Sequence, residues 1–498
     1  MSWQIGNKAM KRFFIFLGMA GMVLASHAQN HNHQMQNAFD QFRKQIQDDF
    51  EDFRSEINRD FIEFLRNPWK EFESEEPVPQ PKEDPVPPVV MPEEDKDKPV
   101  EDNPVVIEDV VKPVPVTPQP QPIKPIEEVP VVEEKTVAFT FFGTEGKVRY
   151  DGSKTFQLNG LEGNAVADAF SVLATEAYDN VICDCLALRK KFHLCDWTYL
   201  LMLKAMSEKL YGPGTNEATL LMAYVYMQSG YRMRLAHDGQ KLYMLYASRH
   251  IIYGQTSYGL NGEMYYGLET LPARLYISEA AFPKEQSLSL LITDRQQFAI
   301  AASAERTFQS SRYPDFKVTT SVNKNLMDFY NSYPTSYYND DFMTRWAMYA
   351  NTPMEGGLKA SLSKQFGKLL AGMGQLAAVE RLLNLIQTGF VYEYDDKVWG
   401  NDRAFFPEET LFYPYCDCED RSILMTRLVR DLLGLKCILI YYPGHLACAV
   451  NFTEDVKGDY IMVGGKKFVV TDPTYIGASV GRTMPDMDNA KAKVILLE

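Results

Sequence analysis

The sequence has little that suits a nucleic acid, an anionic membrane or a disulfide scaffold. Its 498 residues carry 51 Lys and Arg against 66 Asp and Glu, a formal charge of −15, and an acidic chain is repelled by phosphate backbones and anionic lipids. Cysteine is scarce and odd in number at seven, so the thiols cannot all pair within the chain. No stretch after the N-terminal region is long and apolar enough for a transmembrane helix. The composition and length indicate a folded protein of two or three domains.

Residues 1–28 are typical of an export signal. The segment KAMKRFF supplies positive charge, FFIFLGMAGMVLA is an apolar run too short for a comfortable span, and SHA ends in small residues before Gln29. We expect cleavage after Ala28 and a mature protein in the periplasm, at the cell envelope or outside the cell. A membrane-anchored N-terminus is the alternative.

An amphipathic helix with an 11-residue repeat is expected over residues 35–73. Its large apolar side chains recur in steps of 3, 4 and 4, so they stay on one face of a nearly straight helix. The opposite face is charged but not basic, which favours self-association or docking on a protein partner through residues 39–64 over binding to a membrane surface. Packing on the rest of the protein is the remaining alternative. The stripe consists of Phe39, Phe42, Ile46, Phe50, Phe53, Ile57, Phe61 and Phe64.

Residues 74–135 are rich in Pro, Glu and Val. Sixteen of the 28 prolines of the chain lie between Pro77 and Pro130. Proline at this density disfavours helix and sheet and favours extended polyproline II. The composition therefore predicts a disordered spacer between the N-terminal helix and the folded body.

From residue 136 on, the hydrophobic pattern predicts two α+β domains, 136–300 and 301–498. In the second, helical segments precede the strand-like segments KCILIYY, LACAVNF, DYIMVGG and KKFVVTD, which predicts helices packed on an antiparallel sheet. In the first, TNEATLLMAYVYMQSGY echoes DCEDRSILMTRLVRDLLGL, with Asn216 in the place of Cys418. We interpret the first domain as a decayed copy that only packs or binds. An ordinary helix–strand unit is the alternative.

Cys418, His445 and Asp472 are the candidate catalytic residues. Asp417 is expected to cap a helix that begins at Cys418, where the helix dipole and free N–H groups favour a thiolate, although the neighbouring acids oppose it. His445 is the only histidine after His250 and opens an expected strand, and Asp472 ends the next hairpin. A nucleophile, a base and an orienting carboxylate in these places predict acyl transfer through a Cys-His-Asp triad.

The blocks DCEDRS, PGHLACAV and DPTY resemble the three signature blocks of the transglutaminase-like superfamily of papain-type cysteine enzymes. The resemblance covers about residues 380–480 and implies a transglutaminase-like (papain-like) core, with Cys418 as nucleophile, His445 as base and Asp472 as orienter. Together with the Phe-rich helix and the Pro-rich segment, the arrangement is similar to exported Bacteroidetes-type members. One departure is Cys416, where the superfamily usually has a small residue.

The second donor of an oxyanion hole, besides the backbone N–H of Cys418, is expected from an upstream side chain. Gln387 is the first choice and Trp399 the second; a polar residue at a helix end is the other interpretation of Gln387. Cys416 could cap Cys418 through a strained disulfide. A zinc site is not expected, because only His445 and two thiols are at hand, and no cofactor is implied.

The sequence supports two functions from different classes. The first is an exported cysteine hydrolase or acyltransferase acting on peptide or amide bonds, with hydrolysis as the default. The second is an inactive binding or assembly module of the same fold, tethered to a partner through the N-terminal helix.

Overall fold

The computed structural model describes residues 54–96, 98–122, 126, 128, 135–150 and 152–498. The expected export signal and most of the repeat-bearing helix lie outside these residues. The chain divides into two compact units, Met1–Asn58 and Arg59–Glu498. Residues 54–58 of the first unit are helical, and the second unit contains both main sheets and all of the candidate site residues. Within the described ranges, no helix combines the length and apolarity needed to cross a membrane.

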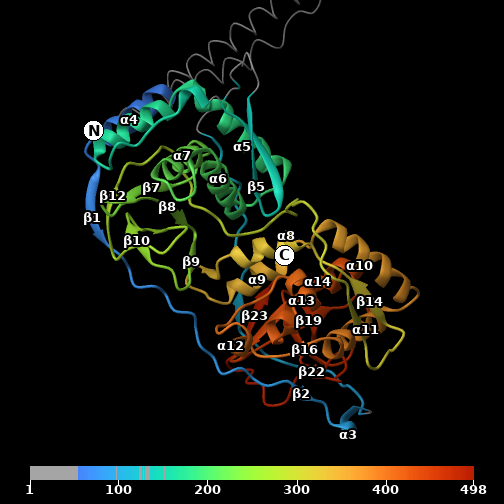
Figure 1. The fold of residues 1–498 in the computed structure, drawn as a ribbon. Helices are drawn as coiled ribbons and strands as arrows, with labels where there is room; N and C mark the ends of the chain where they lie inside the picture. The colour runs from blue at the N-terminus through green and yellow to red at the C-terminus, as the bar shows by residue number, and fades with distance from the viewer. Residues whose placement is uncertain (1–53, 97, 123–125, 127, 129–134, 151) are drawn as a thin grey trace, which may run out of the picture. The chain divides into compact units, whose positions relative to one another are not determined.

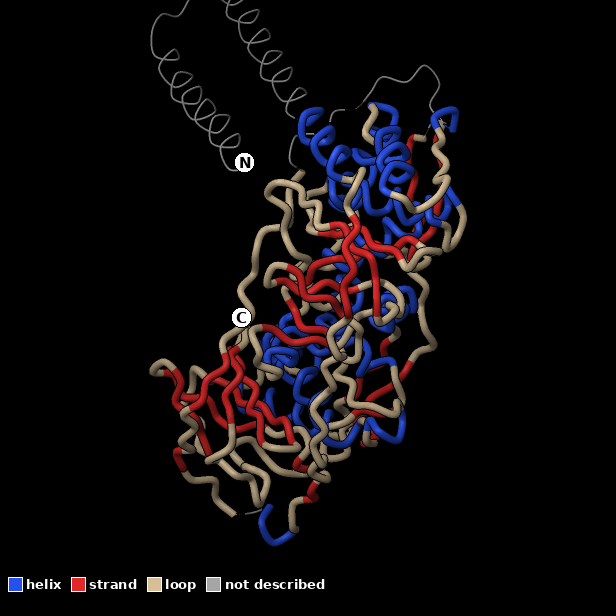
Figure 2. The backbone as a smooth tube through the Cα atoms, turned by 90° about the vertical axis from the view of Figure 1, so that its left-hand side faces the viewer, coloured by secondary structure: helices blue, strands red, loops and turns tan. Residues whose placement is uncertain are grey.

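Arg59–Glu498 is an α+β unit with two main sheets, whose central strands pair antiparallel. Each sheet has its own helices (Figure 1). Figure 2 shows the strands gathered in two groups separated by helices. We call the part around the first sheet the first lobe and the part around the second sheet the second lobe.

The first lobe contains a six-stranded sheet with four main helices. Its helices are α4 (Gly163–Leu173), α5 (Asp179–Lys191), α6 (Asp196–Tyr211) and α7 (Asn216–Gln228). In spatial order the strands are β1 (Trp69–Glu73), β12 (Arg274–Ser278), β7 (Met233–His237), β8 (Leu242–Ser248), β11 (Glu263–Tyr266) and β10 (Ser257–Leu260). A separate hairpin joins β5 (Thr136–Phe141) to β6 (Thr144–Arg149), and β9 (His250–Ile252) pairs with β15 (Ser336–Tyr338).

The second lobe contains a seven-stranded sheet. In spatial order its strands are β3 (Asn103–Pro104), β20 (Asp459–Val463), β21 (Lys466–Thr471), β19 (His445–Asn451), β18 (Lys436–Tyr442), β23 (Lys493–Leu496) and β4 (Asp109–Val111). Its helices are α8 (Lys324–Ser332), α9 (Thr344–Asn351), α10 (Gly356–Leu369), α11 (Gln375–Gly389), α12 (Asp395–Val398), α13 (Pro407–Phe412) and α14 (Cys418–Leu433). The remaining elements are α3 (Glu93–Lys96), the hairpin β13 (Arg306–Gln309)–β14 (Lys317–Thr320), and two parallel pairs, β16 (Val391–Tyr392) with β17 (Tyr415–Cys416) and β2 (Val89–Val90) with β22 (Tyr475–Ile476).

Helix α14 begins and ends where its sequence predicts. The Asp417 side chain accepts hydrogen bonds from the N–H groups of Glu419 and Asp420, and the Asp420 side chain accepts one from the backbone N–H of Asp417, which completes a capping box. Gly434 ends the helix in the left-handed conformation, with φ of 67°. Its apolar face, with Ile423 fully buried, packs on the sheet. The cap therefore fixes Cys418 in the first helical turn.

The two sheets share one topology. The order β12-β7-β8-β11-β10 of the first matches β23-β18-β19-β21-β20 of the second, and all of these neighbours pair antiparallel. Each series follows a helix, α7 in one lobe and α14 in the other, whose first residues are Asn216 and Cys418. A duplicated unit would produce this agreement in strand order. It accompanies the sequence similarity between the segments that begin at Asn216 and Cys418.

Residues 74–122 of the Pro-rich segment contain short strands: β3 and β4 lie at the edges of the second sheet, and Met91, Val105, Val111 and Val114 are buried. Strand β1, at the edge of the first sheet, corrects the helix expected over residues 35–73, because its residues Trp69–Glu73 follow Pro68, which ends the helical pattern. Figure 1 shows the Pro-rich segment as a blue thread that leaves β1 and continues to β2 and α3. An extended Pro- and Val-rich chain that forms no core of its own can still pair with exposed sheet edges and bury alternate valines, and composition alone does not indicate this.

The last turn of the N-terminal helix packs on the first lobe. Phe61 and Leu65 are buried, and the Phe61 ring lies 5.0 Å from that of Phe170 and 5.5 Å from that of Phe282. Phe64 is exposed. Packing on the protein itself, one of the alternatives for the stripe, therefore holds for Phe61, and residues 39–53 lie outside the described part of the chain.

Deleting residues 59–135, which include the edge strands β1, β3 and β4, is expected to destabilise the rest of the protein. A chain of residues 136–498 leaves β12, β20 and β23 as open edges, which lowers stability and favours aggregation. We expect its thermal unfolding midpoint to fall by about 5 °C or more relative to a chain of residues 59–498, by differential scanning calorimetry. Equal midpoints and equally monomeric elution would contradict a stabilising role for these edge strands.

Candidate active site

A buried hydrogen bond joins two of the three candidate catalytic residues. His445 opens β19 directly after the turn at Gly444, and Asp472 follows the last residue of β21, the neighbour of β19. The Nε2 atom of His445 lies 2.9 Å from Oδ2 of Asp472, and both side chains are almost fully buried. The other carboxylate oxygen of Asp472 accepts a hydrogen bond of 2.8 Å from the N–H of Thr474. The carboxylate is thus fixed from both sides.

This pairing sets the roles of the two imidazole nitrogens. A neutral imidazole that donates from Nε2 keeps a lone pair on Nδ1. Among the described residues, Nδ1 of His445 has no hydrogen-bond partner although it is buried. The histidine therefore presents one nitrogen that is oriented by a carboxylate and one that is free to accept a proton.

Cys418 lies at the start of α14, against the strand that carries the histidine. The backbone N–H of Leu446, the residue after His445, lies close enough to the Cys418 sulfur to lower the pKa of the thiol. One turn further along the helix, the Ser422 hydroxyl donates to the carbonyl of Leu446 at 2.7 Å. The first turn of α14, which carries the nucleophile candidate, therefore lies against the start of β19.

The thiol of Cys418 is held in its neutral form. Burial, followed by the charges of Asp417 and Glu419, raises its pKa well above the ordinary value, while the N–H of Leu446 opposes the shift. Only 7% of the residue is exposed. The expected activation by the helix N-terminus is outweighed in this closed site.

Gln387 supports the aspartate loop instead of facing the thiol. Its Nε2 donates to the carbonyls of Asp472, Tyr475 and Ala478 at 3.3, 2.7 and 3.1 Å, and its Oε1 accepts from the N–H of Gly477. An amide nitrogen has two hydrogens, so these carbonyls leave none for an oxyanion. The alternative Trp399 packs beside Arg403 and Tyr413.

Arg421 is a positioning residue that no sequence pattern indicated. It is fully buried, and its guanidinium donates to the carbonyls of Gln387, Pro473 and Phe390 at 3.1–3.4 Å. It therefore ties α14 to the loop after Asp472. A charged residue within an amphipathic helix usually faces water, so no local signal distinguished it.

Tyr392 is a second residue that the sequence did not single out. Strand β16 pairs in parallel with β17, with Tyr392 opposite Cys416, and the Arg421 guanidinium lies 5.2 Å from the Tyr392 ring. Its hydroxyl is buried and, within the described ranges, makes no hydrogen bond. Burial raises the Tyr392 pKa, and the nearby Cys418 thiolate would raise it further. A neutral phenol with a free O–H therefore lies next to the nucleophile candidate.

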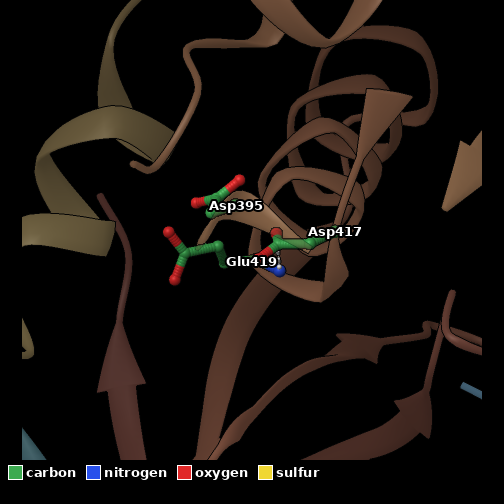
Figure 3. A group of neighbouring side chains, drawn as sticks. All are labelled: Asp395, Asp417 and Glu419. Atoms are coloured by element: carbon green, nitrogen blue, oxygen red, sulfur yellow. Dashed lines mark hydrogen bonds between the residues drawn. The ribbon is translucent and has the colours of Figure 1, made fainter. Parts of the chain in front are cut away.

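A group of carboxylates surrounds the start of α14 on another side. Asp395, Asp417 and Glu419 each offer an oxygen within 4.8 Å of the others. Figure 3 shows the three side chains close to the start of the helix. Glu419 accepts from the indole N–H of Trp346 at 2.6 Å, and the Arg345 guanidinium contacts it at 3.4 Å. Burial and mutual repulsion raise the pKa of Asp395 to about 8, and raise those of Asp417 and Glu419 as well. Carboxylate oxygens are the ligands that hard cations such as Ca²⁺ and Mg²⁺ prefer. The spacing of cysteines and histidines in the sequence gave no indication of this group.

All seven cysteines are free thiols. Cys416 is buried, and its thiol lies 3.7 Å from the carbonyl of Val391 on β16. Burial raises its pKa, and Arg421 opposes the shift. The disulfide between Cys416 and Cys418 stays a hypothesis.

Comparison with protein families and curated proteins found no match. Neither the models of protein families nor the curated protein sequences match this chain. We therefore infer the function from the geometry of the site itself.

The buried carboxyls make stability depend on pH. The pKa is raised to about 8 for Asp395 and to about 7 for Glu408 and Glu409, chiefly by burial, against about 4 in an unfolded chain. The folded state therefore binds more protons, and the free energy of unfolding falls as the pH rises from about 4 to about 8. We expect a lower urea midpoint at about pH 8.5 than at about pH 7, measured in EDTA.

The Asp395→Asn variant should reduce this difference, and Asp396→Asn, at the exposed neighbouring position, should leave it unchanged. Equal urea midpoints for the wild type at the two pH values would contradict the assignment of protonated carboxyls to the folded state.

Proposed function

We propose that the chain is an exported transglutaminase-like cysteine enzyme that attacks peptide or amide carbonyls through Cys418, His445 and Asp472. The observation that carries the proposal is the buried hydrogen bond of 2.9 Å between His445 and Asp472. It is made at the strand end that Ser422, one turn after Cys418 on α14, also contacts. A structural histidine on a strand needs neither a buried carboxylate partner nor a free second nitrogen.

The steps follow from the atoms available. Nδ1 of His445 takes the proton of the Cys418 thiol as the sulfur attacks the carbonyl carbon, and Asp472 stabilises the resulting imidazolium. The tetrahedral intermediate collapses when Nδ1 gives the proton to the leaving amine, which breaks the C–N bond and leaves a thioester. Water, or another amine, then attacks the thioester and restores the thiol. Hydrolysis is the default outcome.

Two donors are available for the oxyanion in this proposal. The N–H of Cys418 lies in the first helical turn and has no acceptor within the helix. The Tyr392 hydroxyl replaces Gln387 as the second donor, since it is buried, lacks a partner among the described residues and lies next to the thiol.

An inactive binding module is the second candidate. The low exposure of Cys418 and the raised pKa of its thiol favour this alternative, because both suppress a nucleophile. The first lobe, which has the same strand order but Asn216 at the place of Cys418, shows that the architecture can exist without the triad.

The triad is tested by acid–base variants. His445→Ala and Asp472→Asn should each lower the rate of peptide-bond cleavage by about 10² or more, because proton transfer loses its base or the orientation of that base. Cleavage would be followed by mass spectrometry on a peptide library, with Cys418→Ala as the blank. Asp472→Asn keeps an acceptor for Thr474, so its unfolding midpoint should stay near the wild-type value. Wild-type cleavage no faster than the Cys418→Ala blank would favour the binding module.

Substitutions of Gln387 and Tyr392 are expected to affect different quantities, stability for Gln387 and kcat for Tyr392. Gln387→Ala removes a side-chain donor from three buried carbonyls, of which only that of Tyr475 keeps another donor among the described residues, the N–H of Ala478. It should destabilise the protein by about 3 kcal/mol in urea unfolding. Tyr392→Phe removes only an unpartnered hydroxyl, so it should leave stability nearly unchanged and lower kcat by about tenfold or more without raising KM. Unchanged kcat in Tyr392→Phe, or unchanged stability in Gln387→Ala, would overturn the corresponding role.

A further inference from the structure

Residues 78–91, which we call the strap, cross the second lobe along the candidate active site. Gln80 donates to the carbonyl of Asp402 at 3.0 Å. Further on, the N–H of Val86 donates to the carbonyl of Gly444 at 2.8 Å. The strap ends as strand β2, which pairs with β22, and the N–H of Met91 donates to the carbonyl of Ile476 at 2.9 Å.

The segments that the strap touches are those that carry the triad. Gly444 directly precedes His445, and β22 begins three residues after Asp472. Asp402 forms an ion pair of 2.5 Å with Arg345, whose guanidinium also contacts Glu419, the residue after Cys418. The strap therefore connects the surroundings of all three catalytic candidates.

The fit between the strap and the turn before His445 is close. The carboxylate of Glu83 accepts from the N–H of Gly444 at 3.0 Å and from the hydroxyl of Tyr441. Gly444 has a φ of +76°, and a Cβ atom built there would lie 2.3 Å from the carbonyl oxygen of Asp84. A side chain at position 444 could not coexist with the strap as it lies.

The three candidate residues are buried in the structure that includes the strap. Cys418, His445 and Asp472 are 7%, 3% and 3% exposed, so little of the sulfur is open to an external carbonyl. Pairing through main-chain atoms binds an extended polypeptide of many sequences, while Glu83 adds one specific acidic contact. Prolines are tolerated between the bonded positions, at Pro85, Pro87 and Pro88.

We infer that the edge formed by Gly444 and β22 is the binding site for an extended acidic peptide, and that the strap occupies this site in the resting chain. The inference depends on the proposed function, since the peptide it admits is the substrate presented to Cys418. Substrate and strap then compete for one surface, and release of the strap opens the nucleophile.

The test uses the full chain and the rate of Cys418 alkylation by iodoacetamide, followed by mass spectrometry. A double variant, Glu83→Ala with Val86→Pro, removes the carboxylate contacts and the N–H that bonds Gly444. Val106→Pro is the matched control, because it adds a proline to the same Pro-rich segment at an exposed position. Hydrogen exchange at Met91 reports whether the strap has opened. If the double variant does not fold, Glu83→Gln takes its place.

We expect at least a tenfold faster alkylation of Cys418 in the strap variant, and the wild-type rate in Val106→Pro. A synthetic peptide of residues 80–91, added in excess, should slow alkylation of the strap variant again and should not affect the wild type. A strap that opens by hydrogen exchange without faster alkylation would overturn the inference, as would a peptide that neither binds nor protects.

A separate measurement tests the proposed function independently of the binding site. Adding His445→Ala to the strap variant should slow alkylation if the imidazole activates the sulfur. Suppose that alkylation of the strap variant is fast and slowed by the peptide, that His445→Ala does not change its rate, and that no peptide is cleaved. This result would support the binding site and contradict the proposed enzymatic activity.

Discussion

The hydrogen bond between His445 and Asp472 is buried, and the surrounding structure is arranged around it. Removing a carboxylate from water is costly unless its oxygens find partners, and Asp472 has His445 on one oxygen and the N–H of Thr474 on the other. The loop after Asp472 is in turn held by Gln387 from α11 and Arg421 from α14. Two buried polar side chains, neither of which takes part in the proposed bond-making steps, thus fix the geometry of the pair.

The comparison between the lobes shows what the pair adds to a shared architecture. In the first lobe, Asn216 begins α7 and accepts a hydrogen bond of 2.8 Å from the N–H of Leu242, the first residue of β8. In the second lobe, Cys418 begins α14, and the N–H of Leu446 near the start of β19 lies close enough to lower the pKa of its thiol. An amide side chain begins the helix in one lobe and a thiol begins it in the other. At the places of His445 and Asp472, the start of β8 and the residue after β11, the first lobe has Leu242 and Gly267.

The local elements of the second lobe follow from the sequence. The cap at Asp417, the Gly434 stop and the turn at Gly444 each have a physical signature within a few residues, so the helix and strands that carry the triad were predictable. The echo between the two helix segments also anticipated the common topology of the sheets.

Other features depend on contacts between distant residues. Composition alone suggested a free spacer for residues 74–135, because edge pairing depends on which sheet edges are open. Gln387 was expected at the oxyanion, but it bonds to carbonyls about 90 residues further along the chain. Tyr392 and the carboxylates of Asp395 and Glu419 meet near Cys418 only through folding, and no spacing rule brings them together.

The most direct test of the catalytic pair is ¹⁵N–¹H NMR of protein labelled at histidine, with the His445 signals assigned by substitution. We predict a neutral imidazole that is protonated at Nε2, with a downfield Nε2 proton that is lost in Asp472→Asn, and an Nδ1 resonance that shifts in Cys418→Ala. An imidazole protonated at Nδ1, or one whose signals ignore both substitutions, would contradict the claim that Asp472 orients His445 toward the thiol.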